Sequence, residues 1–280
     1  MGLRREPTAR QLRLGVELRR LREAAGLKGR EAAELLGVSS VQINQIESGL
    51  TGVSEARLRR LATHYMCTDE ELISALAAMA TQRTHGWWAE YQWQLPKPFL
   101  DLAELEHHAA FLREVQFLFV PGSLQTEDYA RAVFAYRVPV LPPEDIELRV
   151  RHRMQRQTAV TDIPYEVVIH EAALRIMVGD RAASRAQLTH ILERSEAEHV
   201  TVRVIPFHLE GFAGAASAMA YAGGPVPKLD TVVRDSPHGA AFIDSEAQLS
   251  AFRTLFHNVK AVSLDPAHSR TFIHTLAKEL

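Results

Sequence analysis

The side chains best suited to chemical recognition lie between residues 39 and 48, where amides and hydroxyls gather. Ile43, Ile46 and Leu50 recur at three- and four-residue spacing, so we expect them to face a core. That spacing leaves six side chains toward solvent, namely Ser40, Val41, Gln42, Asn44, Gln45 and Ser48. Gln and Asn pair bidentately with adenine in the major groove, and Ser or Val can meet base edges or a thymine methyl. The pattern therefore predicts a helix face that reads double-stranded DNA.

Two short helices joined by a glycine turn would position these side chains. The first, residues 29–36, is expected to stop at Gly37, because glycine adopts the left-handed conformation without a Cβ penalty. Val38 then points inward between the helices. Ser39 is a good N-cap for the second helix, and Gln42 completes an S-x-x-Q capping box. This order and spacing are typical of a helix-turn-helix DNA-binding domain.

Apolar residues at helical spacing flank this pair of helices. Before it they are Leu14, Leu18, Leu21 and Ala25. After Ser54, a residue suited to cap a helix, they are Leu58, Leu61 and Tyr65. A further helix is expected to start with a capping box at Thr68 to Glu71 and to run on through Leu72, Ile73, Leu76 and Met79. Five short helices around one small core are therefore predicted.

Three stretches carry a family likeness: LRRLREAAGL (18–27), AAELLGVS (32–39) and INQIESG (43–49). Through them, residues 11–75 resemble the XRE (Cro/repressor-like) helix-turn-helix family. The resemblance implies that Ser39 to Ser48 lie on the recognition helix, with Ser40, Val41 and Gln45 nearest to bases and Ser48 near a phosphate. A packing unit or a protein-binding module is the alternative to DNA binding.

At the positions that contact phosphates in the family, this chain has different residues. Where the family usually has a Ser or Thr cap followed by a phosphate-touching Gln, this chain has Lys28 and Gly29, and Leu50 stands where a basic residue is frequent. Phosphate contacts need only positive charge within reach. We expect it from the cations Lys28, Arg30, Arg4, Arg5, Arg10 and Arg13.

Charge and length indicate two domains. Residues 1–65 hold twelve Lys or Arg and seven Asp or Glu, a balance of +5, whereas the remaining residues carry −7. A basic end on an acidic chain suits a DNA-facing domain. With 280 residues, the chain is long enough for a second core. We expect a helix-turn-helix domain at 1–80, a linker at 81–86 and a C-terminal domain at 87–280.

The cysteine content and the lack of long apolar stretches indicate the cellular compartment. Cys67 is the only cysteine, so no disulfide forms within the chain, and inert burial of this thiol is favoured over a redox switch. No stretch resembles a signal peptide or a membrane span of ~20 apolar residues. A cytoplasmic, nucleoid-associated protein without membrane contact is the consistent expectation.

The C-terminal domain opens with an aromatic cluster. All three tryptophans, Trp87, Trp88 and Trp93, fall there with Tyr91 among them. Because such rings combine large apolar area with polar groups, Trp87, Trp88 and Tyr91 are candidates for lining a ligand or partner site. The favoured alternative is that they fill the core, since aromatic side chains bury large area wherever they lie.

Helix and strand patterns alternate through the C-terminal domain. Predicted helices cover 100–115, 127–136 capped by Thr126, 185–196, 246–259 and 266–278. Predicted strands cover 116–120, 165–170, 200–207, 217–221 and 231–233. The order strand, helix, strand from 165 to 207 favours parallel pairing with a right-handed crossover. The predicted fold is α + α/β, a five-helix domain followed by a mixed α/β domain.

Acids and arginines share a further predicted helix that begins at Pro142 and Pro143. Its charged residues are Glu144, Asp145, Glu147, Arg149, Arg151, Arg153 and Arg156. The arginines could form a nucleic-acid patch, but acids precede them at i, i+4 spacing, as on a solvated helix face. We favour the solvated face.

A second family likeness spans residues 87–275. It rests on the Trp-Trp start, VPGSLQTEDYARAVF (120–134), VIHEAALR (168–175), VTVRVIPF (200–207) and LDPAHSR (264–270). These stretches resemble a C-terminal domain of unknown function joined to XRE domains in many actinobacterial regulators, some called WhiJ-like or antitoxin-like. The resemblance implies a small partner protein, often encoded beside the regulator. The stretch HAAFLRE (108–114) departs from the Glu- and Ser-rich version common in the family.

Motifs for catalysis and metal binding are missing from the sequence. It has no G-x-S-x-G, no G-x-x-x-x-G-K-[ST] and no H-E-x-x-H, and His170-Glu171 lacks a second histidine. His107 and His108 are adjacent, so on a helix they point about 100° apart and cannot chelate jointly. We expect no catalytic residue, no metal and no cofactor.

These patterns together predict a sequence-specific DNA-binding transcriptional regulator. A homodimer is expected, because one recognition helix reads only a few base pairs and palindromic half-sites match two-fold symmetry. Two occupants of the C-terminal domain stay open. One is a small partner protein, and the other is a small-molecule effector near Trp87, Trp88 and Tyr91.

Overall fold

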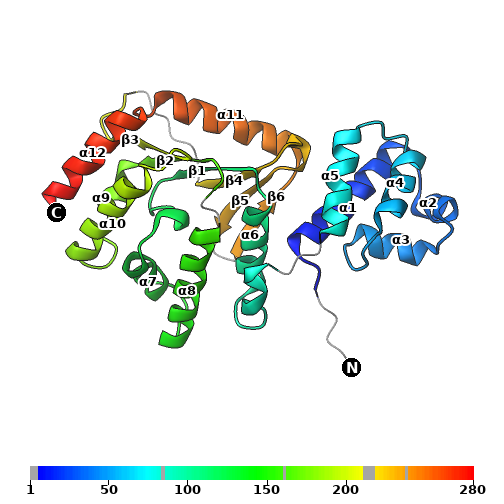
Figure 1. Ribbon diagram of the computed structural model, residues 1–280, viewed down its shortest axis with the longest axis horizontal. Coiled ribbons are helices and arrows are strands. Elements are labelled where there is room, and N and C mark those ends of the chain that lie inside the picture. The colour runs from blue at the N-terminus through cyan, green and yellow to red at the C-terminus, as the bar shows by residue number, and fades with distance from the viewer. Residues whose placement is uncertain (1–5, 83–85, 160–161, 211–217, 237–238) are drawn as a thin grey trace. The chain divides into compact units, whose positions relative to one another are not determined.

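The computed structural model describes the chain except residues 1–5, 83–85, 160–161, 211–217 and 237–238 (Figure 1). The chain divides into two compact units. The first unit runs to Glu90 and includes Phe99–Leu105, and the second comprises Tyr91–Pro98 and Glu106–Leu280. The first is helical and the second combines a sheet with helices, so the predicted α + α/β fold is confirmed.

The first unit begins with five helices, as predicted. They are α1 (Ala9–Ala24), α2 (Gly29–Leu36), α3 (Ser40–Glu47), α4 (Glu55–His64) and α5 (Glu70–Thr81). Their core joins α2, α3 and α4 through Ala32, Ala33, Leu36, Ile43, Leu61 and Tyr65. Val38 packs against this cluster, which confirms its inward direction at the turn.

Short polar side chains mark the starts of these helices. The Ser54 hydroxyl accepts the N–H of Arg57 at 3.4 Å, which confirms it as the cap of α4. At α5 the Asp69 carboxylate accepts the N–H of Leu72 at 3.1 Å. The predicted box beginning at Thr68 is therefore wrong by one residue. A carboxylate suits this position because its charge also favours the positive end of the helix dipole.

Two helical segments follow α5 along the chain. A 3₁₀ helix, η1, covers Trp87–Tyr91, and α6 covers Lys97–His107. Within the first unit, the Asp101 carboxylate of α6 accepts the N–H of Ala9 at 3.0 Å. This bond ties α6 to the start of α1, a contact that no sequence pattern indicated.

Six strands form one mixed sheet in the second unit. They are β1 (Phe111–Gln116), β2 (Tyr165–His170), β3 (Val200–Ile205), β4 (Met219–Gly223), β5 (Thr231–Ser236) and β6 (Gly239–Ile243), in the order β3-β2-β1-β4-β5-β6. The pairs β1–β2 and β2–β3 are parallel, as predicted for β2 and β3, and the other pairs are antiparallel. Ser217, the predicted start of the fourth strand, lies outside the described residues.

The predicted helix at 100–115 and strand at 116–120 are wrong in their boundary. The helix stops at His107, and the strand occupies Phe111–Gln116 instead. β1 lies in the middle of the sheet, between β2 and β4, and helices cover both faces there, so its burial does not alternate strictly. Leu112 and Val115 are both buried, and their three-residue spacing imitates a helix.

Helices cover both faces of the sheet. α11 (Glu246–Val262) lies along one face, and α7 (Glu127–Ala135) and α8 (Pro143–Ala159) lie on the opposite side (Figure 1). Beneath α11 a core joins Leu249, Phe256 and Val259 to Val115 and Val168 of the strands. The remaining elements are η2 (Gly122–Leu124), α9 (Glu171–Arg175), α10 (Arg181–Arg194), η3 (Pro227–Leu229) and α12 (Pro266–Glu279).

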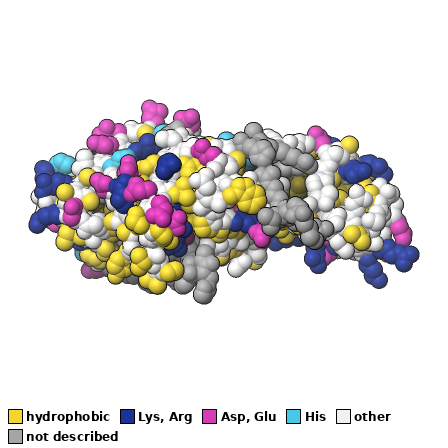
Figure 2. All heavy atoms as spheres, turned by 90° about the horizontal axis from the view of Figure 1, so that it is seen from below, with side chains coloured by type: hydrophobic (Ala, Val, Ile, Leu, Met, Phe, Trp, Pro, Cys, Tyr) yellow, Lys and Arg dark blue, Asp and Glu magenta, His cyan; other side chains and the backbone are white. Residues whose placement is uncertain are grey.

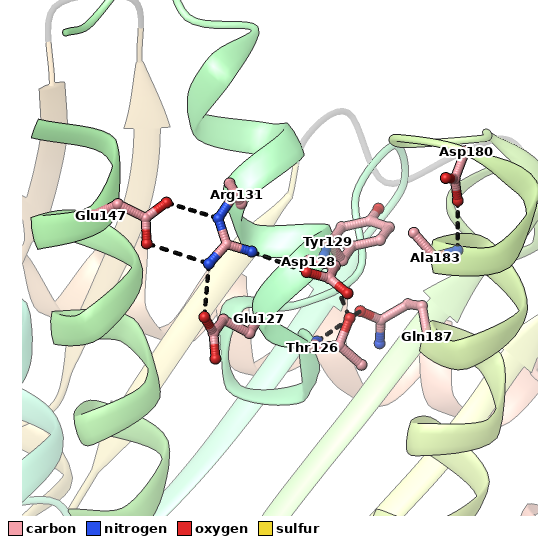
Figure 3. Close-up of polar contacts among 9 residues, drawn as sticks. All are labelled: Thr126, Glu127, Asp128, Tyr129, Arg131, Glu147, Asp180, Ala183 and Gln187. Atoms are coloured by element: carbon pink, nitrogen blue, oxygen red, sulfur yellow. Dashed lines mark hydrogen bonds and ion pairs between the residues drawn. The ribbon is translucent and has the colours of Figure 1, made fainter. Parts of the chain in front are cut away.

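Polar side chains fix α7 between α8 and α10 (Figure 3). Arg131 of α7 donates to Glu147 of α8 at 2.7 Å and to Glu127 at 2.6 Å. The amide oxygen of Gln187, on α10, accepts the N–H of Thr126 at 2.8 Å. The Thr126 hydroxyl accepts the N–H of Tyr129 at 3.3 Å, which confirms its role as the cap of α7.

The solvated-face interpretation of the α8 arginines is wrong for most of them. Arg149 and Arg156 are buried, Arg153 is half-buried, and Arg151 is exposed. His152 is also buried. The sequence pattern did not reveal this burial. An arginine adds nothing to a hydrophobic pattern, even when its helix face turns inward.

Candidate nucleic-acid interface

The outward face of α3 presents most of the predicted contact residues. Ile43 and Ile46 are buried and anchor the helix, while Val41 is 64% exposed. Ser39, Ser40, Asn44 and Ser48 are also exposed, and Gln42 and Gln45 are half-buried. The helix therefore offers hydroxyl, amide and methyl groups to solvent on one side.

Leu50 does not face the core, so that expectation is wrong. It is 56% exposed. α3 ends at Glu47, and Gly49 has a φ of 71°, which turns the backbone out of the helical course before Leu50. A Cβ at Gly49 would lie 2.9 Å from the carbonyl oxygen of Gln11, so the chain passes close to α1 at this turn.

The start of α3 is fixed by the glycine turn and the serine cap. Gly37 ends α2 with a φ of 73°, as predicted. The Ser39 hydroxyl then accepts the N–H of Gln42 at 3.2 Å, which confirms the predicted cap. This cap satisfies one of the free N–H groups at the helix start and leaves Ser40 and Val41 on the first turn, toward solvent.

The end of α3 is clamped to α1 by a buried ion pair. Arg22 donates through Nε and Nη2 to the two carboxylate oxygens of Glu47, at 2.6 and 2.9 Å. Its Nη1 donates to the carbonyl of Leu27 at 2.7 Å. The hydrogen bonds to Glu47 raise the pKa of the Arg22 guanidinium. A bidentate pair with both partners buried holds the angle of α3.

A glycine allows the two helices to approach at this clamp. A Cβ at Gly15 of α1 would lie 2.5 Å from the carbonyl oxygen of Glu47, closer than any side chain permits. Burial raises the pKa of the nearby Tyr65 hydroxyl to about 12. The C-terminal end of α3 is thus backed by close-packed backbone.

Gln45 is oriented by its neighbours. Its side-chain oxygen accepts from the Thr51 hydroxyl at 3.4 Å, and its carbonyl accepts from the Ser48 hydroxyl at 3.2 Å. The side-chain amide nitrogen is the group that these bonds leave for a ligand. Gln45 is therefore better suited to donate a hydrogen bond to a base than to accept one from it.

The predicted phosphate contacts divide into reachable and enclosed cations. Lys28 is exposed, and its backbone N–H donates to Glu31 at 2.6 Å. Arg30 is exposed and pairs with Glu34 at 3.1 Å. Arg13 is buried and pairs with Glu17 at 3.1 Å, so it is less accessible to a phosphate than Lys28 or Arg30.

The structure adds little evidence for phosphate contacts by the other N-terminal arginines. Arg4 and Arg5 lie outside the described residues. Arg10 is half-buried, contacts Gln82 at 3.4 Å, and has its pKa lowered by desolvation. Sequence reasoning missed exposed cations of α4, although Leu58 and Leu61 face the core and the helical spacing leaves three arginines outside, namely Arg57, Arg59 and Arg60.

The aromatic residues 87–93 do not form one site. In the first unit Trp88 is buried, and the half-buried Trp87 meets it edge-on with 6.1 Å between ring centroids. In the second unit the buried Tyr91 donates to Gln155 at 2.6 Å and packs edge-on against His152. Trp93 is 79% exposed. The burial of Trp88 and Tyr91 fits the core alternative.

Nothing in the described residues indicates a metal centre or a membrane span. No group of three or more His, Cys, Asp or Glu side chains among them could hold a metal ion. Across those same residues, no helix has the length and apolar character needed to cross a membrane. Cys67 is a free, half-buried thiol.

Comparison with known protein families gives two matches. Residues 13–76 match the model described as a helix-turn-helix domain. Residues 99–275 match the model described as a domain of unknown function (DUF5753). Neither a curated protein nor a solved structure matches the chain.

Proposed function

Because the chain belongs to the DUF5753 family and carries a helix-turn-helix domain ahead of it, we propose that it is a sequence-specific DNA-binding transcriptional regulator of the XRE type. The observation that carries this proposal is the outward face of α3. Hydroxyl, amide and methyl groups stand there on a helix whose two ends are fixed. These are the groups that read base edges in the major groove.

In this proposal the first turns of α3 enter the major groove. Ser40, Val41 and Asn44 meet base edges, Gln45 donates its amide N–H to a base acceptor, and Ser39, Gln42 and Ser48 lie toward the sugar-phosphate strands. Lys28 and Arg30 supply phosphate contacts. The Arg22–Glu47 clamp keeps the helix angle constant, so binding energy is not spent on ordering the helix. No catalytic step is required.

A homodimer completes the proposed mode of binding. One α3 covers only a few base pairs, and a second copy related by a two-fold axis would read the other half of a palindrome. The residues that join the copies are left open by this proposal.

Selection of binding sites from random DNA tests the proposal with the full chain. Gln45→Ala should relax base choice and cost about 1 to 3 kcal/mol on the preferred site. Asn258→Ala is the matched control, since it removes an exposed amide from α11 in the second unit. Identical selected sequences for Gln45→Ala and the parent would exclude Gln45 as a base contact, and no selected sequence for the parent would refute the proposal.

For the second unit we propose docking of a small partner protein, as in the WhiJ-like or antitoxin-like regulators of actinobacteria. Its support is exposed apolar surface, which Figure 2 shows gathered along one side of this unit. Five of the exposed apolar residues follow α7 or α9: Tyr136, Val138, Val140, Ile176 and Met177. A Cβ at Gly179 would lie 3.4 Å from the Cβ of Ala132, so the segment after α9 approaches α7. Large exposed apolar patches mark interaction surfaces.

Co-expression with each small protein encoded by a gene next to that of this chain tests the docking proposal. A stable complex is expected, and Val138→Asp should weaken it while leaving DNA binding unchanged, because Val138 is almost fully exposed. Equal affinity for Val138→Asp and the parent would exclude this surface. The alternative occupant, a small molecule at Trp87, Trp88 and Tyr91, has less support because Trp88 and Tyr91 are buried.

A further inference from the structure

The interior of the second unit contains a polar cluster on the side of the sheet that α8 covers. Its members come from α6, β1, the loop before α7, α8 and β2, and they are Glu106, Glu114, Gln125, Arg153, Arg156 and Tyr165. So many polar groups inside a protein require partners, because each unpaired one costs free energy. The partners can be counted one by one.

Most of the cluster is satisfied internally. Arg156 donates to Glu106 at 2.8 Å, and both side chains are buried. Glu114 accepts from the Tyr165 hydroxyl at 2.7 Å and from the Gln116 amide at 2.7 Å. Burial raises the pKa of Glu114 despite these bonds. These contacts account for the polar groups as parts of the fold.

Arg153 is the exception in the cluster. It donates through Nη1 to the amide oxygen of Gln125 at 2.5 Å, and its guanidinium lies 4.3 Å from the ring centroid of Phe134. No carboxylate among the described residues lies within ion-pair distance of it. Desolvation lowers its pKa to about 9. An enclosed guanidinium without a counter-charge is costly to keep, and most of its five N–H donors stay available.

Arg153 nevertheless keeps accessible surface, since its side chain is half-buried. Small solutes can therefore reach it. Asp235 of β5 and Glu114 both act on its pKa from a distance, so the surroundings are polar rather than apolar. The sequence interpretation of α8 as a solvated face did not distinguish Arg153 from the exposed Arg151.

Glu106 supplies a second, independent observation. Its Oε1 accepts from Arg156, but its Oε2 is buried and has no hydrogen-bond partner in the described part of the chain. Glu106 is 6% exposed, and burial raises its pKa to about 7. An acceptor left open inside a protein points to a donor that is not part of the chain.

The frame around Arg153 is rigid. The loop before α7 is held by three glutamines: Gln125 donates to the carbonyl of Val120 at 2.7 Å, Gln157 to that of Gly122 at 2.8 Å and Gln187 to that of Leu124 at 2.6 Å. Gly122 lets the arginines approach, since a Cβ there would lie 2.6 Å from Nη2 of Arg156. A preorganised guanidinium loses little entropy on binding.

We propose that Arg153 anchors a binding site for a small organic anion, a carboxylate or a phosphate ester, which also presents a hydrogen-bond donor to Glu106. The guanidinium fork matches both kinds of anion bidentately. The donor satisfies the open oxygen of Glu106. This site makes the second unit a receptor for a small metabolite, and it is independent of the proposed DNA contacts.

Arginine footprinting of the full-length parent protein tests the site. Phenylglyoxal attacks neutral guanidine, so the lowered pKa of Arg153 should make it reactive. The probes are sodium phosphate and sodium acetate, each compared with sodium chloride at equal ionic strength, with modified peptides measured by mass spectrometry. A bound anion should protect Arg153 from the reagent. The rate of modification at Arg153 should therefore be divided by one plus the ratio of anion concentration to Kd. The exposed Arg151 on the same helix is the control.

Each outcome decides the proposal. Protection of Arg153 by phosphate alone supports a phosphate ester, and protection by acetate alone supports a carboxylate. Equal rates at Arg153 in all three salts, or equal protection of Arg151, would overturn the site. If Arg153 does not react with phenylglyoxal, which is larger than either anion, the melting temperatures of the variant described below decide. Since no DNA is present, failure here leaves the DNA-binding proposal standing.

A variant gives a second measurement. Arg153→Met keeps the side-chain length but removes the charge, so phosphate and acetate should no longer raise the melting temperature of the protein. Arg151→Met is the matched control and should keep the parent's response. An Arg153→Met variant that is stabilised by the anions as much as the parent would contradict the proposal. If this variant does not fold, the footprint of the parent decides alone.

Discussion

Arg22 of the first unit and Arg153 of the second both turn inward from a helix, yet they are matched differently. Arg22 meets both oxygens of Glu47, and these bonds raise its pKa. Arg153 meets an uncharged amide, and desolvation lowers its pKa to about 9. The same side chain thus serves as a clamp where a carboxylate faces it and is free to bind an anion where none does.

The packing around the two arginines also differs: backbone contacts backbone in the first unit, and side chains surround Arg153 in the second. In the first unit, Gly15 of α1 lies directly against the backbone carbonyl of Glu47, the residue that Arg22 holds. At Arg153 the neighbours are side chains of α8 and a loop held by glutamines. Close-packed backbone fixes the angle of α3, whereas the second unit leaves the side chain of Arg153 within reach of solutes.

Removal of the clamp should have the largest effect. Arg22→Met leaves the Glu47 carboxylate buried without its partner, which typically costs about 3 to 5 kcal/mol. Hydrogen exchange of the α3 amides in the full chain measures this loss locally. Arg19→Met is the control, since its pair with Glu23 is exposed and should contribute almost nothing.

A double variant sharpens this test. Arg22→Met combined with Glu47→Leu removes both charges and should recover much of the lost protection, because apolar residues of similar volume tolerate that position. If Arg22→Met behaved like Arg19→Met, the clamp would not be what holds α3.

Two glycine substitutions compare the rigidity of the two regions. A Cβ at Gly15 would strike the backbone of Glu47 at 2.5 Å, so Gly15→Ala should cost about 1 to 3 kcal/mol although alanine is the better helix former. The tightest contact of a Cβ at Gly122 would be the end of the Arg156 side chain at 2.6 Å, and a side-chain end can shift by a few tenths of an ångström more easily than backbone can. Gly122→Ala should therefore be milder. Denaturant midpoints of both variants measure the difference, and the reverse order would contradict it.

The pH dependence of stability should report the buried carboxyl of the second unit. Because burial raises the pKa of Glu106 to about 7, its proton is held by the folded state in a range where the unfolded chain releases it. The stability from this group is complete below its usual pKa near 4.5 and is lost as pH rises through about 7.

Glu106→Gln isolates this contribution because the amide does not titrate. The unfolding free energy of the parent minus that of the variant should fall from pH 5 to pH 8, by at most about 1.4 kcal/mol per pH unit. Glu114, whose pKa burial also raises, is present in both proteins and largely cancels. Urea unfolding at several pH values measures the difference, and a flat difference would show that Glu106 does not titrate in this range.

Local signals in the sequence were enough to predict α3 and its outward face. Gly37, Ser39 and the spacing of Ile43 and Ile46 act within one or two helical turns, and the structure confirms each. Leu50 failed because Gly49 redirects the backbone after the helix ends, and a spacing rule assumes that the helix continues.

The polar interior could not be predicted from spacing. Arg13 and Arg156 are buried, but their side chains give the same pattern as solvated arginines. Whether such an arginine is buried depends on its partners, and Arg156 meets Glu106 only because the fold brings α6 and α8 together. The same reason hid Arg153, whose partner Gln125 lies on another element.

The smallest expected effect concerns the reachable and enclosed cations of the first unit. Lys28 is exposed, so Lys28→Ala should make the slope of log affinity against log salt shallower by about one unit, through one lost phosphate contact. Arg13 is buried against Glu17, so Arg13→Met should leave that slope unchanged even if it lowers stability. Filter binding of the full chain to its selected site, from low to physiological salt, measures both. A parental slope for Lys28→Ala would remove Lys28 from the interface. A shallower slope for Arg13→Met would return Arg13 to it, because a cation that never leaves its carboxylate cannot release counterions from DNA.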